Sequence, residues 1–128
     1  MKRRFGIPAA LFGFVAVACG AFGAHALRGR MSPEMLAVWE TASRYMMYHA
    51  VALLVLSGVA RRSTSRTVPI GAWCFIAGVC LFSGSLYALA LTGQRAFGMI
   101  TPLGGVCLLA GWLSLAIGAA FSQHTMDP

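Results

Sequence analysis

The chain has 128 residues, of which 59% are hydrophobic and only 10% charged. Ten Lys and Arg residues against three Asp and Glu residues give a formal net charge of +7. The basic residues stand in short clusters without interleaved aromatic residues, which argues against nucleic-acid binding. The sequence holds no phosphate loop, nucleophile elbow or paired carboxylates, so we expect no enzyme activity and no catalytic residues.

Four long apolar stretches run along the chain and hold almost no charge. A helix needs about 17 to 25 mainly apolar residues to cross a bilayer, and only a helix satisfies the backbone of a single segment in lipid. We therefore expect one integral membrane domain over residues 1–128, with spans at about 5–27, 43–60, 68–91 and 97–121. The predicted fold is all-α, a membrane-embedded up-down four-helix bundle.

The segment before the second span has a pattern of its own. Ser32-Pro33-Glu34 predicts a helix start, because Ser is a favoured N-cap and Pro a favoured first helical residue. The helical pattern then runs to Ala60, too far for one perpendicular span at about 1.5 Å per residue. We therefore expect an interfacial amphipathic segment before the second span, with Trp39 in the aromatic belt of the membrane surface.

Basic residues flank the spans unevenly and predict the orientation. One side receives Lys2, Arg3, Arg4, Arg61, Arg62 and Arg66, and the other receives Arg28, Arg30 and Arg95, with Arg44 inside or beside a helix. The positive-inside rule then predicts that both termini lie in the cytoplasm. Ala24-His25-Ala26 resembles a signal-peptide cleavage site, but the apolar stretch before it exceeds the roughly 7 to 15 residues of such a signal, so we expect no cleavage.

Small residues recur at helical spacing and predict how the spans pack. The stripes are Gly13, Ala16, Gly20 and Ala24 in the first span, Gly71, Gly78 and Ser85 in the third, and Gly104, Gly111 and Gly118 in the fourth. Small residues allow helix backbones to approach closely in lipid, so we expect a compact left-handed bundle. The same faces could also seat a partner protein or a second copy of the chain.

Polar residues within the spans gather toward one side of the membrane. They are His25, Tyr45, His49, Ser83, Ser85, Tyr87 and Thr101. Polar groups inside a membrane cost free energy, so we expect His25, His49, Ser83, Ser85 and Thr101 to face inward and bond one another. We expect His49 to bond a neighbouring span, at Ser83, at Ser85 or at the backbone freed by Pro102.

Two histidines supply too few ligands for a tetrahedral metal site, and no haem attachment motif is present, so we expect neither a metal nor a cofactor. The four cysteines, Cys19, Cys74, Cys80 and Cys107, all fall within apolar spans without a C-x-x-C pair. We expect them to be free thiols.

Successive motifs in the chain resemble those of one family. They are Gly20-Ala21-Phe22-Gly23-Ala24-His25, Tyr48-His49-Ala50, Phe82-Ser83-Gly84-Ser85-Leu86-Tyr87 and Thr101-Pro102-Leu103-Gly104-Gly105 with Gly111-Trp112. The family is catalogued as domain of unknown function 423, comprises YgdD-like small membrane proteins and is related to transmembrane protein 256. The resemblance implies an inner-membrane protein with four spans and brings no function. The chain departs from the family pattern at Met46, where similar proteins often have Gln.

Three functions remain open from the sequence. The first is an accessory or structural subunit that packs against a membrane protein partner, or against its own copies, among membrane lipids. The second is a small channel or transporter with a one-sided polar half-cavity, weakened by the lack of a buried carboxylate to couple ions. The third is a lipid, quinone or haem site around His25 and His49.

Overall fold

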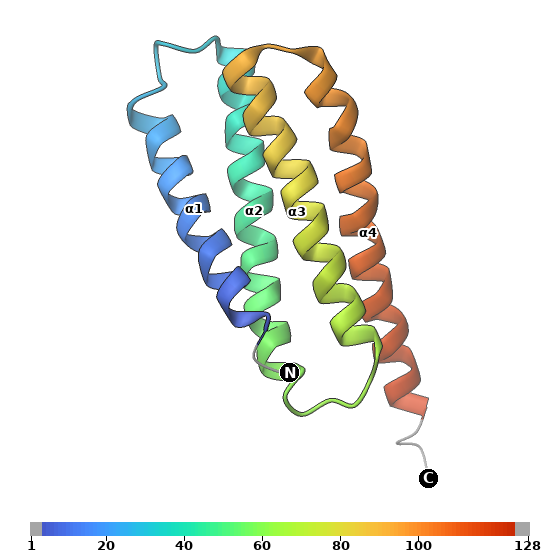
Figure 1. Cartoon of the computed structure of the whole chain (residues 1–128). Coiled ribbons are helices and arrows are strands. Elements are labelled where there is room, and N and C mark those ends of the chain that lie inside the picture. Colours follow the sequence, from blue (N-terminus) through green and yellow to red (C-terminus); the bar gives the residue numbers. More distant parts are fainter. Residues whose placement is uncertain (1–3, 125–128) are drawn as a thin grey trace.

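In the computed structural model, residues 4–124 are described and form four helices: α1 (Gly6–His25), α2 (Pro33–Val59), α3 (Thr67–Thr92) and α4 (Arg95–His124). Successive helices run in opposite directions (Figure 1). The α1–α2 and α3–α4 connections define an upper end, and the α2–α3 connection defines a lower end. The predicted all-α fold is confirmed. Lys2 and Arg3 of the N-terminal basic cluster lie outside the described residues.

The helices are suited to a membrane, although not equally. α1, α3 and α4 are long and apolar enough to cross a bilayer by length and composition. α2 falls short by the same measure because Arg44, Tyr45, Tyr48 and His49 lower its hydropathy. α2 lies between α1 and α3 and packs against both.

α2 is one unbroken helix of 27 residues. Its start follows the prediction, because Ser32 Oγ accepts a hydrogen bond from the Met35 amide at 3.2 Å and Pro33 occupies the first turn. The amphipathic segment expected at the interface is therefore the N-terminal part of the same helix. Trp39 is only 5% exposed, so the expectation of an interfacial belt position is wrong for this residue.

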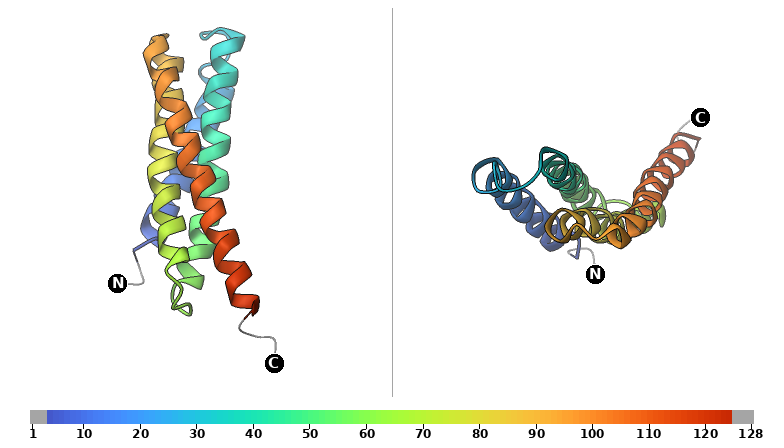
Figure 2. Two further views of the ribbon diagram at one scale, coloured as in Figure 1. Left: turned by 90° about the vertical axis from the view of Figure 1, so that its right-hand side faces the viewer. Right: turned by 90° about the horizontal axis from the view of Figure 1, so that it is seen from above.

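The four helices form a curved layer with α1 and α4 at its two edges (Figure 2). Extensive packing joins each helix only to its neighbours in the chain: α1 to α2, α2 to α3 and α3 to α4. The bundle is thus open between its first and last helices, and less compact than expected. Large apolar side chains cover the outside, with Phe14 on α1 and Leu109 on α4 exposed by 73% and 70%.

Glycines bring α3 and α4 into close contact. A Cβ atom added at Gly104 would collide with the backbone of Phe82, and one at Gly111 would lie 2.6 Å from Cε1 of Phe75. Gly71, Gly78 and Gly118 face Leu115, Leu108 and Thr67 in the same way. The prediction that these seven-residue stripes serve packing is confirmed for α3 and α4. Their surfaces are therefore filled within the chain.

α1 uses only part of the predicted stripe: Ala16 is buried and Gly13 faces Ala50, whereas Ala24 is exposed. The predicted stripe is Gly13, Ala16, Gly20 and Ala24. The buried residues of α1 are Ala9, Ala16 and Gly23. Nothing lies within 4 Å of a Cβ added at Gly20, whereas one added at Gly23 would be 2.6 Å from Cδ1 of Trp39. The bulk of the Trp39 indole thus selects the glycine that α1 turns inward.

Candidate functional site

The residues predicted to form a one-sided polar cluster occupy different environments. His49, Ser83 and Ser85 are buried, Tyr87 and Thr101 are half-buried, and His25 and Tyr45 are exposed. The buried and half-buried members form hydrogen bonds at three helix interfaces. The structure therefore brings together most of the predicted residues, but in separate groups.

The first group joins α1, α2 and α3 near the upper end. The Tyr87 hydroxyl and Ser43 Oγ are 2.7 Å apart, and the Tyr87 ring meets the Trp39 indole edge-on with ring centroids 4.6 Å apart. Trp39 Nε1 donates to the Cys19 carbonyl of α1 at 2.7 Å. Ser83 Oγ donates to the Ala42 carbonyl at 2.8 Å. Side chains of α2 and α3 thus tie three helices together at one depth.

The second group joins α3 and α4. Ser85 Oγ lies 2.6 Å from Thr101 Oγ1, and it also reaches the Phe82 carbonyl at 3.0 Å. Thr101 directly precedes Pro102, which stands inside α4 and has no amide hydrogen to donate. The expected meeting of Ser85 and Thr101 is therefore present, at the level where Gly104 allows the two backbones to approach.

The third group lies near the middle of the layer and centres on His49. Trp112 Nε1 of α4 donates to His49 Nε2 at 3.1 Å, and His49 Nδ1 lies 2.7 Å from the Tyr45 carbonyl. Since an indole N–H only donates, Nε2 must accept, and the ring proton then belongs on Nδ1, facing Tyr45. Phe75 of α3 packs against both rings, with centroids 5.0 Å from His49 and 4.9 Å from Trp112.

Two details of the prediction are wrong. His49 bonds Trp112 and not Ser83, Ser85 or the backbone near Pro102. Ser83 is level with Ala42, seven residues and about 10 Å above His49 along α2. His25 is exposed and does not face inward, because it is the last residue of an edge helix whose extensive packing is with α2. The two histidines therefore do not frame a common site.

Several residues of these groups are absent from the predicted cluster, namely Trp39, Ser43, Phe75 and Trp112. The signal that could have found the aromatic ones is a glycine on the facing helix: Gly23 opposite Trp39 and Gly111 opposite Phe75. A glycine that leaves space on one helix predicts a large ring on its neighbour. The order of residues along each helix does not say which ring that is.

These hydrogen bonds hold the helices together and leave few buried polar groups free to bind a ligand. Within residues 4–124, every buried side-chain nitrogen or oxygen has a hydrogen-bond partner. Both ring nitrogens of His49 are engaged in this way. Cys19, Cys74, Cys80 and Cys107 are free thiols, as predicted. Cavities of about 470 and 300 Å³ lie elsewhere, at the lower end around the α2–α3 connection.

Apolar helices that bury their few polar side chains in interhelical hydrogen bonds define a small multi-span helical membrane protein. The chain belongs to the family described as protein of unknown function (DUF423), whose model matches residues 19–105. That range contains all of the predicted cluster, but not Trp112.

Bacterial relatives agree over most of the chain. A UPF0382 membrane protein of Staphylococcus aureus (strain bovine RF122 / ET3-1) is 49% identical over 115 residues, which cover 90% of this chain and 93% of that protein. The UPF0382 membrane protein YwdK of Bacillus subtilis (strain 168) is 42% identical over 116 residues, covering 90% and 94%. No solved structure matches the chain. The chain is thus a bacterial membrane protein of this family.

Proposed function

We propose that the protein is an accessory subunit of the inner membrane, without enzyme activity, that packs against another membrane protein through the outer face of α2. This face consists of Glu40, Arg44, Tyr48 and Val51, which follow one another at helical spacing. Tyr48 and Val51 are 58% and 54% exposed, and the side chains of Glu40 and Arg44 are 50% and 68% exposed. The single observation that carries the proposal is this exposed face with charged and polar residues on α2, the helix that packs between the apolar helices α1 and α3.

The contacts between α1 and α2 give the depth of this face. Trp39 lies against Gly23. Ala50 is level with Gly13, because a Cβ atom added at Gly13 would lie 3.9 Å from Cβ of Ala50. Arg44 stands between these levels, five residues below Trp39, whereas α1 ends two residues above Gly23. At about 1.5 Å per residue, the backbone of Arg44 therefore lies about 10 Å deeper in the layer than the end of α1.

Charged groups at such a depth favour a partner. A charged side chain at the centre of a bilayer costs about 2.5 to 3.5 kcal/mol on insertion scales, and less toward the surface. Glu40 and Arg44 offset part of this cost by pairing, but their closest atoms are 3.9 Å apart and both side chains stay exposed. A neighbouring helix that supplies polar groups would complete the pair, as the helices of this chain do for one another.

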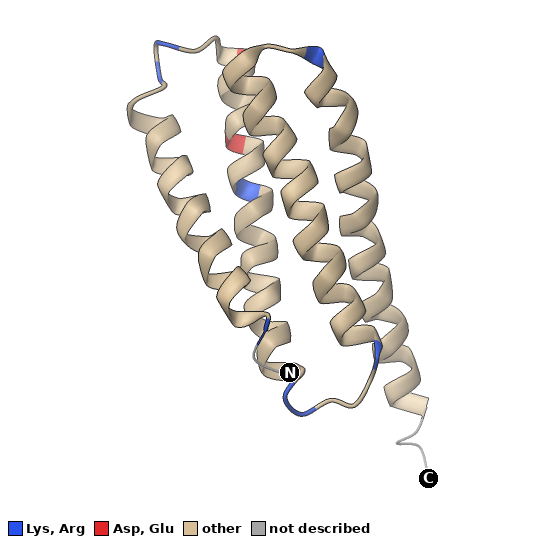
Figure 3. Cartoon of the chain, in the orientation of Figure 1, with Lys and Arg blue, Asp and Glu red and all other residues tan. Residues whose placement is uncertain are grey.

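The filled glycine stripes of α3 and α4 support this choice of surface. A partner that used those stripes would have to displace Phe75, Phe82 or Leu108. The outer face of α2 needs no such displacement. The uneven distribution of arginines between the two ends supports cytoplasmic termini, because the lower end carries Arg4, Arg61, Arg62 and Arg66 (Figure 3).

A photo-reactive phenylalanine derivative at position 48 tests the proposal in cells. Position 109 is the matched control, because Leu109 is 70% exposed on α4 and lies near the depth of Tyr48, as the His49–Trp112 bond shows. We expect position 48 to give one defined adduct with a different membrane protein, and position 109 to give none. The adduct should weaken when Glu40→Gln and Arg44→Gln are introduced together.

Other outcomes would contradict the proposal. An adduct of twice the mass of the chain would show self-association in place of an accessory role. Equal labelling at both positions, or an adduct unchanged by the paired substitutions, would show that α2 has no specific outer partner. Recovery of the protein alone after purification in mild detergent would point in the same direction.

A further inference from the structure

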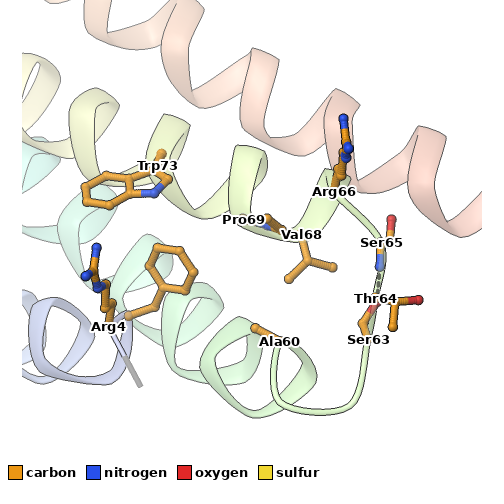
Figure 4. Close-up of a pocket in the computed structure, with 10 residues that line it drawn as sticks. Arg4, Ala60, Ser63, Thr64, Ser65, Arg66, Val68, Pro69 and Trp73 are labelled. Carbon is orange, nitrogen blue, oxygen red and sulfur yellow. Dashed lines mark hydrogen bonds between the residues drawn. The ribbon is translucent and has the colours of Figure 1, made fainter. Parts of the chain in front are cut away.

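A cavity of about 470 Å³ opens at the lower end, between the start of α1, the end of α2 and the start of α3 (Figure 4). Phe5, Val68 and Trp73 form its apolar wall. Phe5 and Val68 are buried, and the Phe5 ring meets the Trp73 indole edge-on with centroids 5.7 Å apart. Trp73 lies six residues after Thr67, so the wall extends about 9 Å from the start of α3 into its apolar part.

The mouth of this cavity is basic. Arg4 stands on the side of Trp73, and Arg66 leaves the α2–α3 connection on the opposite side (Figure 4). The hydroxyl residues Ser63, Thr64 and Ser65 line the mouth between α2 and α3. Glu34 and Glu40, the acidic residues of the described chain, both lie in the upper half of α2 (Figure 3). No carboxylate within residues 4–124 therefore competes with an anion at this mouth.

The backbone adds to the positive potential. Phe5 and Arg66 are the N-cap residues of α1 and α3, and neither side chain caps its helix. Both helix starts therefore direct the positive end of the helix dipole toward this end of the molecule, and at the start of α3 the Thr67 amide donates to Ser65 Oγ at 3.3 Å. The connection itself is ordered by hydrogen bonds, including Ser65 Oγ to Thr67 Oγ1 at 2.8 Å and Ser114 Oγ to the Thr67 carbonyl at 3.0 Å.

We propose that this cavity binds an anionic phospholipid, with its phosphate at the basic mouth and the part of one acyl chain nearest the headgroup along Phe5, Val68 and Trp73. A soluble phosphate would use only the mouth, whereas the apolar wall runs from the mouth toward the membrane interior. An amphiphile at the membrane surface matches both parts. The inference is independent of the partner surface on α2, because the cavity lining shares no residue with that surface.

The binding of phosphatidylglycerol to the purified full chain tests this, measured in detergent by native mass spectrometry and by the rise in melting temperature. Phosphatidylcholine is the neutral comparison lipid, and inorganic phosphate is the soluble competitor. Each basic residue near an anionic lipid contributes about 1 kcal/mol, so Arg4→Gln with Arg66→Gln should weaken phosphatidylglycerol binding roughly thirtyfold. Arg61→Gln with Arg62→Gln removes the same charge outside the cavity and should change binding less than about threefold.

A second variant tests the apolar wall without altering charge. Ala60 lines the cavity, and Ala60→Leu should fill part of it and lower retention of the lipid severalfold. If this variant does not fold, the paired arginine variants still decide. Equal binding of the two lipids, or equal losses in the two arginine pairs, would overturn the proposal. Displacement of the lipid by millimolar inorganic phosphate would assign the site to a soluble anion instead.

Discussion

Replacing Gly104 by Ala should push α3 and α4 apart at their closest approach. A Cβ at this position would lie 2.8 Å from both Cα and Cβ of Phe82 and would collide with its amide nitrogen. Ordinary carbon contacts lie at about 3.5 to 4.0 Å, so the backbones must separate by about 1 Å. Backbone atoms cannot rotate away as a side-chain tip can, so the whole interface has to open.

The size of the effect follows from the contacts that open. A gap of about 0.5 to 1 Å forfeits a quarter to a half of the dispersion energy of each contact, and overpacked cores lose about 1 to 3 kcal/mol. Ala also favours helix over Gly by up to about 1 kcal/mol, which hides part of the loss. Gly84→Ala shares this gain without any clash, because nothing lies within 4 Å of its added Cβ.

The comparison of these two variants isolates the contact. We expect Gly104→Ala to be about 1 to 3 kcal/mol less stable than Gly84→Ala. The free energy of unfolding can be measured by titrating sodium dodecyl sulfate into mixed micelles and following helix content by circular dichroism. Two variants of equal stability, within about 0.5 kcal/mol, would refute the reasoning and would mean that α3 and α4 already have room at Gly104.

Removing one hydroxyl group from a helix interface should lower the free energy of unfolding by the contribution of one hydrogen bond. Tyr87→Phe removes the bond to Ser43 and should lower the unfolding free energy by about 1 kcal/mol in the same titration; an unchanged value would show that this bond contributes nothing. A double-mutant cycle of Ser85→Ala and Thr101→Val should give a coupling of about 0.5 to 1.5 kcal/mol, and additive losses would exclude a direct bond. A reporter enzyme fused after Pro128 should be active in the cytoplasm, and activity only in the periplasm would invert the proposed orientation.

The features that could be predicted from the sequence are those that depend on one helix at a time. The helices follow from apolar length, and the start of α2 follows from Ser32 and Pro33. The Gly104–Gly111–Gly118 stripe could be predicted because, in lipid, glycines repeated along one helix face allow a second backbone to approach.

The features that could not be predicted depend on the relative position of two helices along their axes. The pairing of His49 with Trp112 requires the depth of α2 relative to α4, and packing at Gly111 and Phe75 sets that depth. Counting residues from the helix ends placed Ser83 too near His49. Trp39 has an amphipathic ring that suits a membrane surface equally well, and only Gly23 on another helix shows that it is buried.

The packing of each helix against its neighbours in the chain has a consequence for biosynthesis. Each helix after α1 that leaves the ribosome and enters the membrane finds a neighbour to pack against already there, and most interhelical contacts form as local hairpins. Proteins with such local contacts fold fast. The bond between Trp112 and His49 spans 63 residues, and among the hydrogen bonds described above it alone joins two helices that are not adjacent in the chain. His49 Nε2 therefore lacks this donor until α4 has been inserted, so α2 reaches its final hydrogen bonding only when the whole layer is in the membrane.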